Sequence, residues 1–119
     1  MEQTRDLLNV IVKGIQEKKG SEIVVADLSG IEGSICKQFV ICQGNSPTQV
    51  EAIAESIGEM ARKELREKPA TVDGLQYAQW VAMDYTDIIV HIFLPEMRQF
   101  YDLEHLWEDA PLKRIADVG

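Results

Sequence analysis

Three acids and a histidine in the second half of the chain are the residues whose types could support acid–base chemistry. Asp84, Asp87, His91 and Glu104 lie within one segment. Asp84 and Asp87 flank a predicted turn, where an aspartate side chain commonly bonds nearby backbone amides without any catalytic role. No serine, cysteine or lysine nucleophile is tied to His91 by the sequence. We therefore interpret His91 as a hydrogen-bonded structural residue and expect no catalytic residue.

A second candidate chemistry is phosphate binding at Gly44-Asn45-Ser46, which precede a predicted helix. Exposed amides at a helix N-terminus can hold a phosphate. The chain lacks both Gly-x-x-x-x-Gly-Lys and Gly-x-Gly-x-x-Gly, and a glycine with a capping serine is ordinary for a strand-to-helix turn. A nucleotide-binding or nucleotidyltransferase-like enzyme remains the alternative function, and nucleotide-dependent thermal stabilisation would reveal it.

The third candidate is a binding surface. In a strand "IIVHIFL", His91 and Phe93 share one face, and pairing around "DYTD" would place Trp80 and Asp84 beside them. Such a face is covered by the chain's own Tyr101 and Trp107, by a partner protein, or by a second copy of the chain. Tryptophan and tyrosine are enriched at the energetic centres of interfaces.

The elements that position these residues follow from hydrophobic periodicity and turn signals. Residues 4–19 predict an amphipathic helix with Thr4 as the cap at its start, Gly20 closing its end, and an apolar stripe of Leu8, Ile11, Val12 and Ile15. Strands at 22–28 and 39–42 follow and are expected to pair antiparallel. A second helix begins with Ser46 as cap, Pro47 at the first position and Gln49 in a capping-box arrangement. Its apolar stripe should lie on the sheet.

Two further strands, at 79–84 and 88–94, predict a hairpin, and Pro95 ends the second one. Residues 96–107 predict a closing helix or two short turns, whose expected anchors are Met97, Phe100, Tyr101, Leu103, Leu106 and Trp107. Ile88, Val90 and Ile92 are expected in the core beneath the helices. The predicted fold is a single α/β or α+β domain over residues 1–119, with a mixed β-sheet packed with helices.

Composition limits the function further. The 119 residues carry 20 acids against 12 lysines and arginines, a formal net charge of −8. Free nucleic acid would be repelled at long range, whereas a basic protein would be attracted. No signal-peptide pattern or run of about 20 apolar residues is present, so we expect a cytoplasmic protein.

The cysteines and histidines predict neither a disulfide nor a metal site. Cys36 and Cys42 would lie about 20 Å apart in one strand, too far to pair, and we expect buried free thiols. No Cys-x-x-Cys is present, and His91 and His105 are not spaced as a helical metal pair. We expect no metal and no cofactor.

Several ordered blocks resemble one known family. "FVICQGNSPTQVEAIAESI", "VDG…W", "DYTDIIVHIF" and "RQFYDLEHLWEDA" closely resemble the ribosomal silencing factors, also called the RsfS or Iojap family. The resemblance runs from Leu7 to about Ala110. It implies a fold similar to that of nucleotidyltransferases. The Asp-x-Asp of their catalytic motif is absent, because Asp84 and Asp87 are three positions apart and not two.

The same resemblance implies a function. A family member is expected to bind the large ribosomal subunit through its ribosomal protein number fourteen at the intersubunit face. It would block joining of the small and large subunits and repress translation under nutrient limitation. The family motifs match Leu103 and the residues that we predict to bind the partner: Trp80, Asp84, Asp87, His91, Phe93, Tyr101, Glu104 and Trp107.

One position departs from the family pattern. Members usually carry glycine in the turn where this chain has Thr86. If that turn requires a positive φ, threonine will strain it.

Overall fold

A mixed six-stranded sheet organises the chain, in the order β3-β4-β5-β2-β1-β6. The computed structural model describes residues 2–34, 36–106 and 109–116. The β2 and β5 strands run parallel, and the other neighbours are antiparallel. The predicted α+β fold with a mixed sheet is confirmed. The strands are β1 (Ser21–Asp27), β2 (Gln38–Gln43), β3 (Thr71–Asp73), β4 (Trp80–Asp84), β5 (Ile88–Phe93) and β6 (Leu112–Ile115).

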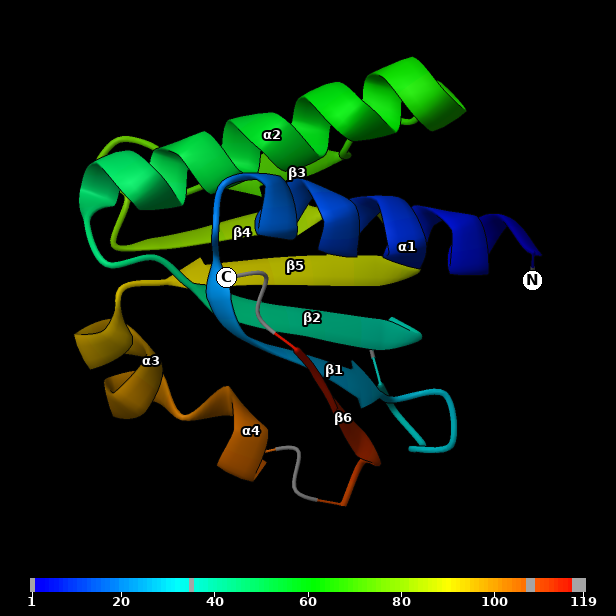
Figure 1. Ribbon diagram of the computed structural model, residues 1–119. Helices are drawn as coiled ribbons and strands as arrows, with labels where there is room; N and C mark the ends of the chain where they lie inside the picture. The colour runs from blue at the N-terminus through cyan, green and yellow to red at the C-terminus, as the bar shows by residue number, and fades with distance from the viewer. Residues whose placement is uncertain (1, 35, 107–108, 117–119) are drawn as a thin grey trace.

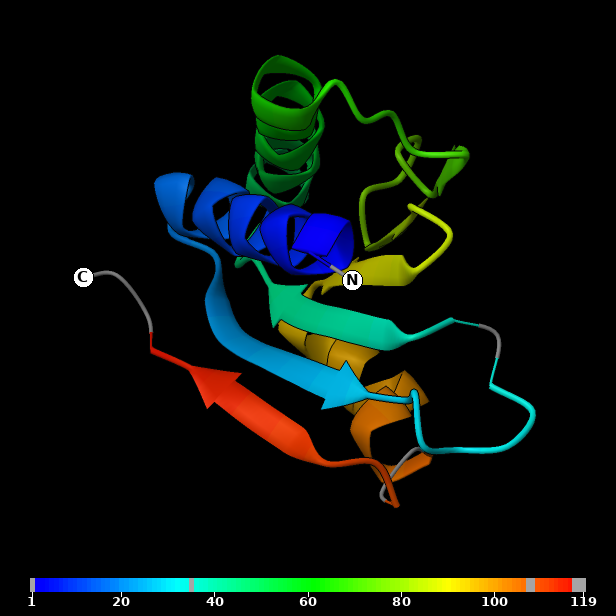
Figure 2. The ribbon, with the colours of Figure 1, turned by 90° about the vertical axis from the view of Figure 1, so that its right-hand side faces the viewer.

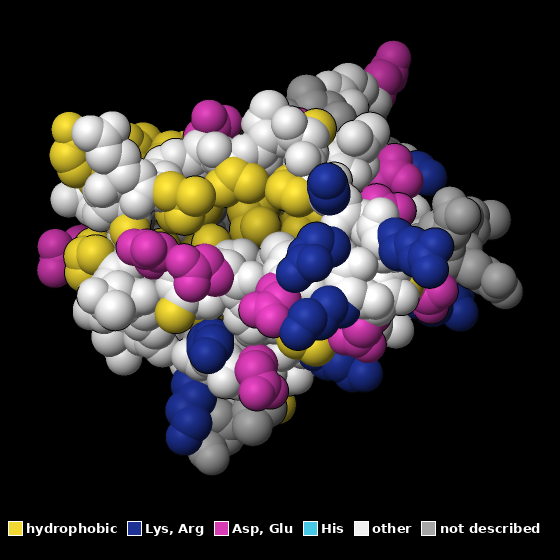
Figure 3. Space-filling view, turned by 90° about the horizontal axis from the view of Figure 1, so that it is seen from above, with side chains coloured by type: hydrophobic (Ala, Val, Ile, Leu, Met, Phe, Trp, Pro, Cys, Tyr) yellow, Lys and Arg dark blue, Asp and Glu magenta, His cyan; other side chains and the backbone are white. Residues whose placement is uncertain are grey.

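Helices lie on both faces of this sheet. The longer helices, α1 (Glu2–Glu17) and α2 (Pro47–Leu65), cover one face, and the short α3 (Pro95–Tyr101) and α4 (Leu103–Leu106) lie against the other (Figures 1 and 2). Seen from the side of α1 and α2, apolar side chains form a band among mixed charges (Figure 3). On the second face, the short helices α3 and α4 determine which part of the sheet is covered.

The larger part of the core lies between the sheet and the two long helices. Ile88, Val90 and Ile92 are fully buried there, as predicted. The buried stripe of α1 is turned slightly from the expected one, because Leu7 and Val10 are buried while Leu8 and Val12 are only half-buried. A smaller cluster on the opposite face comprises Ala26, Leu28, Cys36, Phe39, Ile41, Phe93 and Ala110.

Gly14 brings the long helices close together. A Cβ placed there would lie 2.9 Å from the Ile57 Cα. Ser56 Oγ donates a buried hydrogen bond of 2.8 Å to the Gly14 carbonyl. The packing of α1 on α2 therefore depends on a backbone-to-backbone approach that only glycine permits.

The start of α2 follows its sequence signals. The Ser46 hydroxyl accepts from the Gln49 amide at 3.1 Å, and Gln49 Oε1 accepts from the Asn45 amide at 2.7 Å. Gln49 Nε2 also donates to the carbonyls of Lys18 and Lys19, both at 3.2 Å. The predicted Ser46 cap is confirmed, but the Gln49 side chain returns to the Asn45 amide and not to the Ser46 amide of a capping box. Gln49 also joins α2 to the end of α1.

The predicted bounds of α1 were wrong at its start. The helix begins at Glu2, so Thr4 lies inside it and its hydroxyl donates to Asp87 Oδ2 at 3.0 Å. The left-handed residue after the helix is Lys19, with φ +59°. Gly20 follows, and its amide donates to the Ile15 carbonyl at 2.9 Å.

Two edge strands and one cysteine differ from the sequence prediction. β3 and β6 were not predicted, because each has only three or four residues and depends on pairing with a distant strand. Cys36 precedes β2 instead of lying within it. Both Cys36 and Cys42 are nevertheless buried free thiols, as expected.

Candidate partner-binding site

The β4–β5 hairpin sets the positions of the predicted site residues. Trp80 lies opposite Phe93, Ala82 opposite His91, and Asp84 opposite Ile89. Trp80 and Phe93 belong to the smaller hydrophobic cluster, on the face away from α1 and α2. The predicted placement of Trp80 beside His91 and Phe93 is therefore confirmed.

Four aromatic rings meet where this hairpin adjoins α3. The Trp80 ring stacks on Phe93 with centroids 5.1 Å apart and lies 4.5 Å from the Tyr101 ring. Phe100 makes an edge contact with Tyr101 at 5.1 Å. We call Trp80, Phe93, Phe100 and Tyr101 the aromatic end. Its rings come from β4, β5 and α3, so tertiary packing assembles it.

The aromatic end is only partly covered. Phe93 is fully buried and Trp80 is half-buried, whereas Tyr101 is 42% and Phe100 78% exposed. Tyr101 does fold back over Trp80, one of the predicted ways to cover this face. Trp107, the other predicted cover, lies outside the described residues. Phe100 was expected to anchor the closing helix, but it projects into solvent, so that expectation was wrong.

His91 lies beside Trp80 and accepts a hydrogen bond from it. The Trp80 indole N–H donates to His91 Nδ1 at 3.1 Å. The neutral ring consequently carries its proton on Nε2, which is buried without a hydrogen-bond partner among the described residues. Burial lowers the pKa of His91 to about 4. This uncharged, enclosed ring can orient Trp80.

The two aspartates occupy the opposite end of the hairpin. Asp84 Oδ1 accepts from the Thr86 amide at 2.7 Å, and Asp87 Oδ2 lies 3.7 Å from Lys37 Nζ. Asp84 lies four positions after Trp80 in β4, about 13 Å along a strand. The predicted site is thus divided between the aromatic end and an acidic turn.

Thr86 lies at the centre of that turn with φ +77°. The Asp87 amide donates to the Tyr85 carbonyl at 3.0 Å, which closes a tight turn around Thr86. The condition under which threonine was predicted to strain the hairpin is therefore met.

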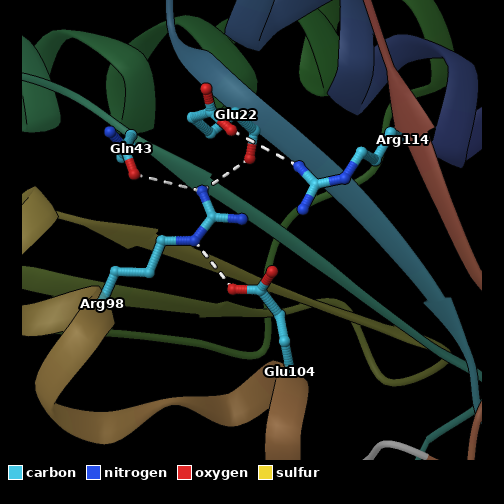
Figure 4. A network of polar contacts seen from close by, with 5 residues as sticks. All are labelled: Glu22, Gln43, Arg98, Glu104 and Arg114. Atoms are coloured by element: carbon cyan, nitrogen blue, oxygen red, sulfur yellow. Dashed lines mark hydrogen bonds and ion pairs between the residues drawn. The ribbon is translucent and has the colours of Figure 1, made fainter.

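Arg98 is the important residue that sequence reasoning missed. Only 10% of its side chain is exposed, and Nε donates to Glu104 Oε1 at 2.9 Å. Nη1 donates to the Glu22 carbonyl at 2.6 Å and to Gln43 Oε1 at 3.3 Å (Figure 4). Glu104, predicted to meet a partner, is engaged within the chain. No local signal reveals this network, because Glu22 and Gln43 lie 76 and 55 positions from Arg98.

The groups of the Gly44-Asn45-Ser46 turn are used within the chain. The Gly44 amide donates to the Phe93 carbonyl at 3.0 Å, and the Asn45 amide and Ser46 hydroxyl both bond Gln49. These contacts favour the structural interpretation of the turn over phosphate binding. Within the described ranges, no group of three or more histidine, cysteine, aspartate or glutamate residues could hold a metal ion, and no helix could cross a membrane.

A family model and two sequence relatives relate this chain to one protein family. The family model described as ribosomal silencing factor during starvation matches residues 1–119. The ribosomal silencing factor of Halalkalibacterium halodurans is 36% identical over 114 residues and 96% of each chain, and that of Bacillus subtilis is 36% identical over 115 residues, 97% of this chain and 95% of the relative.

A solved structure gives the same relationship in three dimensions. A crystal structure of a Chromobacterium violaceum protein superposes with a TM-score of 0.83 at 29% identity, covering 97% of this chain and 92% of that one. The fold is α+β, and the family match together with the named relatives defines the class as regulatory factors associated with the ribosome. The chain belongs to the ribosomal silencing factor family, as its sequence blocks predicted.

Proposed function

We propose that the protein binds the large ribosomal subunit in the cytoplasm, through ribosomal protein number fourteen at the intersubunit face. Bound there, it blocks joining of the small subunit by steric occlusion and represses translation when nutrients are limiting. The mechanism needs no catalytic residue, metal or cofactor. Its main support is the partly exposed aromatic end on a chain of the silencing-factor family.

The aromatic end supplies the apolar part of the proposed contact. Trp80, Tyr101 and Phe100 combine exposed area with rigid rings, the composition of an interface centre. Phe93 and His91 lie behind them and fix the position of Trp80. Trp107 completes the set of predicted contact residues.

The acids supply charge complementarity. The net charge of −8 favours a basic ribosomal protein over free nucleic acid. Asp84 and Asp87 lie at the acidic turn, and Lys37 offsets Asp87 only in part because both side chains are about half exposed. We expect these acids to affect the association rate and its salt dependence more than the final affinity.

Sedimentation with separated ribosomal subunits tests the proposal. The protein should co-migrate with the large subunit and not with the small one, and it should lower the yield of joined ribosomes. Trp80→Ala should weaken binding by about 2 kcal/mol, roughly 30-fold. Phe100→Ala should weaken it by about 1 kcal/mol without affecting folding, because that ring is 78% exposed.

Leu112→Ala is the matched control, since Leu112 is 46% exposed on β6, the opposite edge of the sheet. Its binding should equal that of the unchanged protein. Binding that survives both Trp80→Ala and Phe100→Ala would show that the aromatic end is not the contact surface.

Self-association through the same aromatic end is the competing use of this surface. A homodimer of that kind would dissociate on dilution and on Phe100→Ala, and it would compete with the ribosome. Sedimentation equilibrium of the protein alone separates the two uses, because ribosome binding by a monomer requires no concentration-dependent dimer.

A further inference from the structure

The helix that carries Phe100 and Tyr101 is too short to hold its position without tertiary contacts. α3 has seven residues, and its N-cap, Leu94, makes no side-chain capping bond. A helix of this length is not stable in isolation. Met97 packs on the smaller hydrophobic cluster, but most of α3 is exposed. The position of α3 therefore depends on what attaches it to the sheet.

Arg98 provides that attachment through acceptors on three different elements. Its guanidinium reaches the Glu22 carbonyl on β1, Gln43 Oε1 on β2 and Glu104 Oε1 on α4 (Figure 4). A guanidinium is planar and its donors have fixed directions, so these contacts constrain both the place and the orientation of the side chain. Because Arg98 is almost fully buried, water competes weakly for its donors.

The sheet has a local irregularity at the point where Arg98 binds. The β1–β2 register shifts between Ser21 and Val24, so two residues of β1 oppose one residue of β2. Glu22, in this bulge, has φ +52°. Bulges re-aim backbone groups, and here the Glu22 carbonyl meets the guanidinium. Arg114 of β6 also contacts Glu22 Oε2, at 3.4 Å.

We propose that Arg98 is a positioning residue for the partner surface. By holding α3 and α4 against the β1 bulge and the end of β2, it sets Tyr101 and Phe100 relative to Trp80. The inference rests on the proposed function. It also gives Glu104 a different role. Glu104 holds Arg98 in place within the protein and does not contact the ribosome directly.

The structural part of the inference can be measured without ribosomes. In the unchanged protein, NMR should show nuclear Overhauser contacts between the Trp80 indole and the Tyr101 ring, whose centroids are 4.5 Å apart. Arg98→Met keeps an apolar stem but removes the donors, and these contacts should weaken several-fold. If they persist unchanged in a folded Arg98→Met protein, Arg98 does not position Tyr101.

A double-mutant cycle on large-subunit binding tests the functional part. If Arg98 acts through α3, Arg98→Met should lower the affinity at least about 10-fold. In a protein that already carries Tyr101→Ala, the same change should lower the affinity much less. Additive losses would overturn the inference. If the unchanged protein does not bind, the proposed function fails, while the NMR result still decides whether Arg98 positions Tyr101.

Two controls separate positioning from general loss of stability. Ser56→Ala removes a buried hydrogen bond between α1 and α2, and affinity should stay within about 2-fold despite lower stability. Glu104→Gln removes the charge that pairs with Arg98 Nε, so affinity and the Trp80–Tyr101 contacts should weaken together. A 10-fold loss in Glu104→Gln with intact Trp80–Tyr101 contacts would show direct charge pairing with the partner instead.

Discussion

Trp80 donates its indole N–H to the Nδ1 atom of His91, at 3.1 Å. This bond couples a half-exposed ring to a buried one. It also determines that the neutral imidazole carries its proton on Nε2. The contact that holds Trp80 in the aromatic end therefore depends on the protonation state of His91.

We expect stability to fall with acidification through His91. Its pKa is lowered from 6.5 to about 4 in the folded protein, so the unfolded chain takes up a proton first as the pH falls. The contribution is fully present above about pH 6.5 and is lost towards pH 4, at most about 3 kcal/mol.

Urea unfolding between pH 7.5 and 4 measures this dependence. His91→Asn keeps an acceptor for Trp80 but cannot titrate, so the difference in unfolding free energy between the two proteins should narrow as the pH falls. A constant difference across this range would mean that His91 is not buried in its neutral form.

Thr86→Gly should stabilise the protein. Thr86 has φ +77°, a conformation that costs a residue with a Cβ roughly 1–2 kcal/mol. Glycine avoids this cost but loses more entropy on folding, so we expect a net gain of about 1 kcal/mol. Thr86→Ala is the control and should gain little, since alanine keeps the strained φ. Equal denaturation midpoints for the glycine and alanine variants would contradict strain at this turn.

Gly14→Ala should destabilise the protein although alanine is the better helix former. The added Cβ would lie 2.9 Å from the Ile57 Cα, so the helices must separate, at a cost of about 1–3 kcal/mol. Gly58→Ala in α2 is the matched control. Its Cβ would meet only Met83 Cε, at 3.8 Å, so helix propensity should raise stability by up to about 1 kcal/mol. Thermal or urea unfolding should show opposite signs for the two variants.

Cys42 should resist thiol reagents while the protein is folded. Burial raises its pKa from 9.0 to about 12, which leaves about 1,000-fold less thiolate at neutral pH, and the side chain is fully buried. In a Cys36→Ser background, a chromogenic disulfide reagent should modify Cys42 only at the rate at which the protein opens. Rapid labelling in buffer that becomes no faster in denaturant would contradict this burial.

The sequence by itself determined the elements with strong local signals. Ser46, Pro47 and Gln49 act within one helical turn, so the start of α2 was predictable. Alternation in β5 separated Ile88, Val90 and Ile92 from His91 and Phe93 because side chains of a strand point to opposite faces. The ordered sequence blocks likewise indicated the family.

Only the tertiary structure decided how the candidate site is arranged. Phe100 looked like a core anchor by composition, yet the path of α3 exposes it. Arg98 meets acceptors from distant parts of the chain, and no local pattern records such a pairing. Periodicity reports which face a residue takes within its own element, whereas contacts between elements depend on how the whole chain packs.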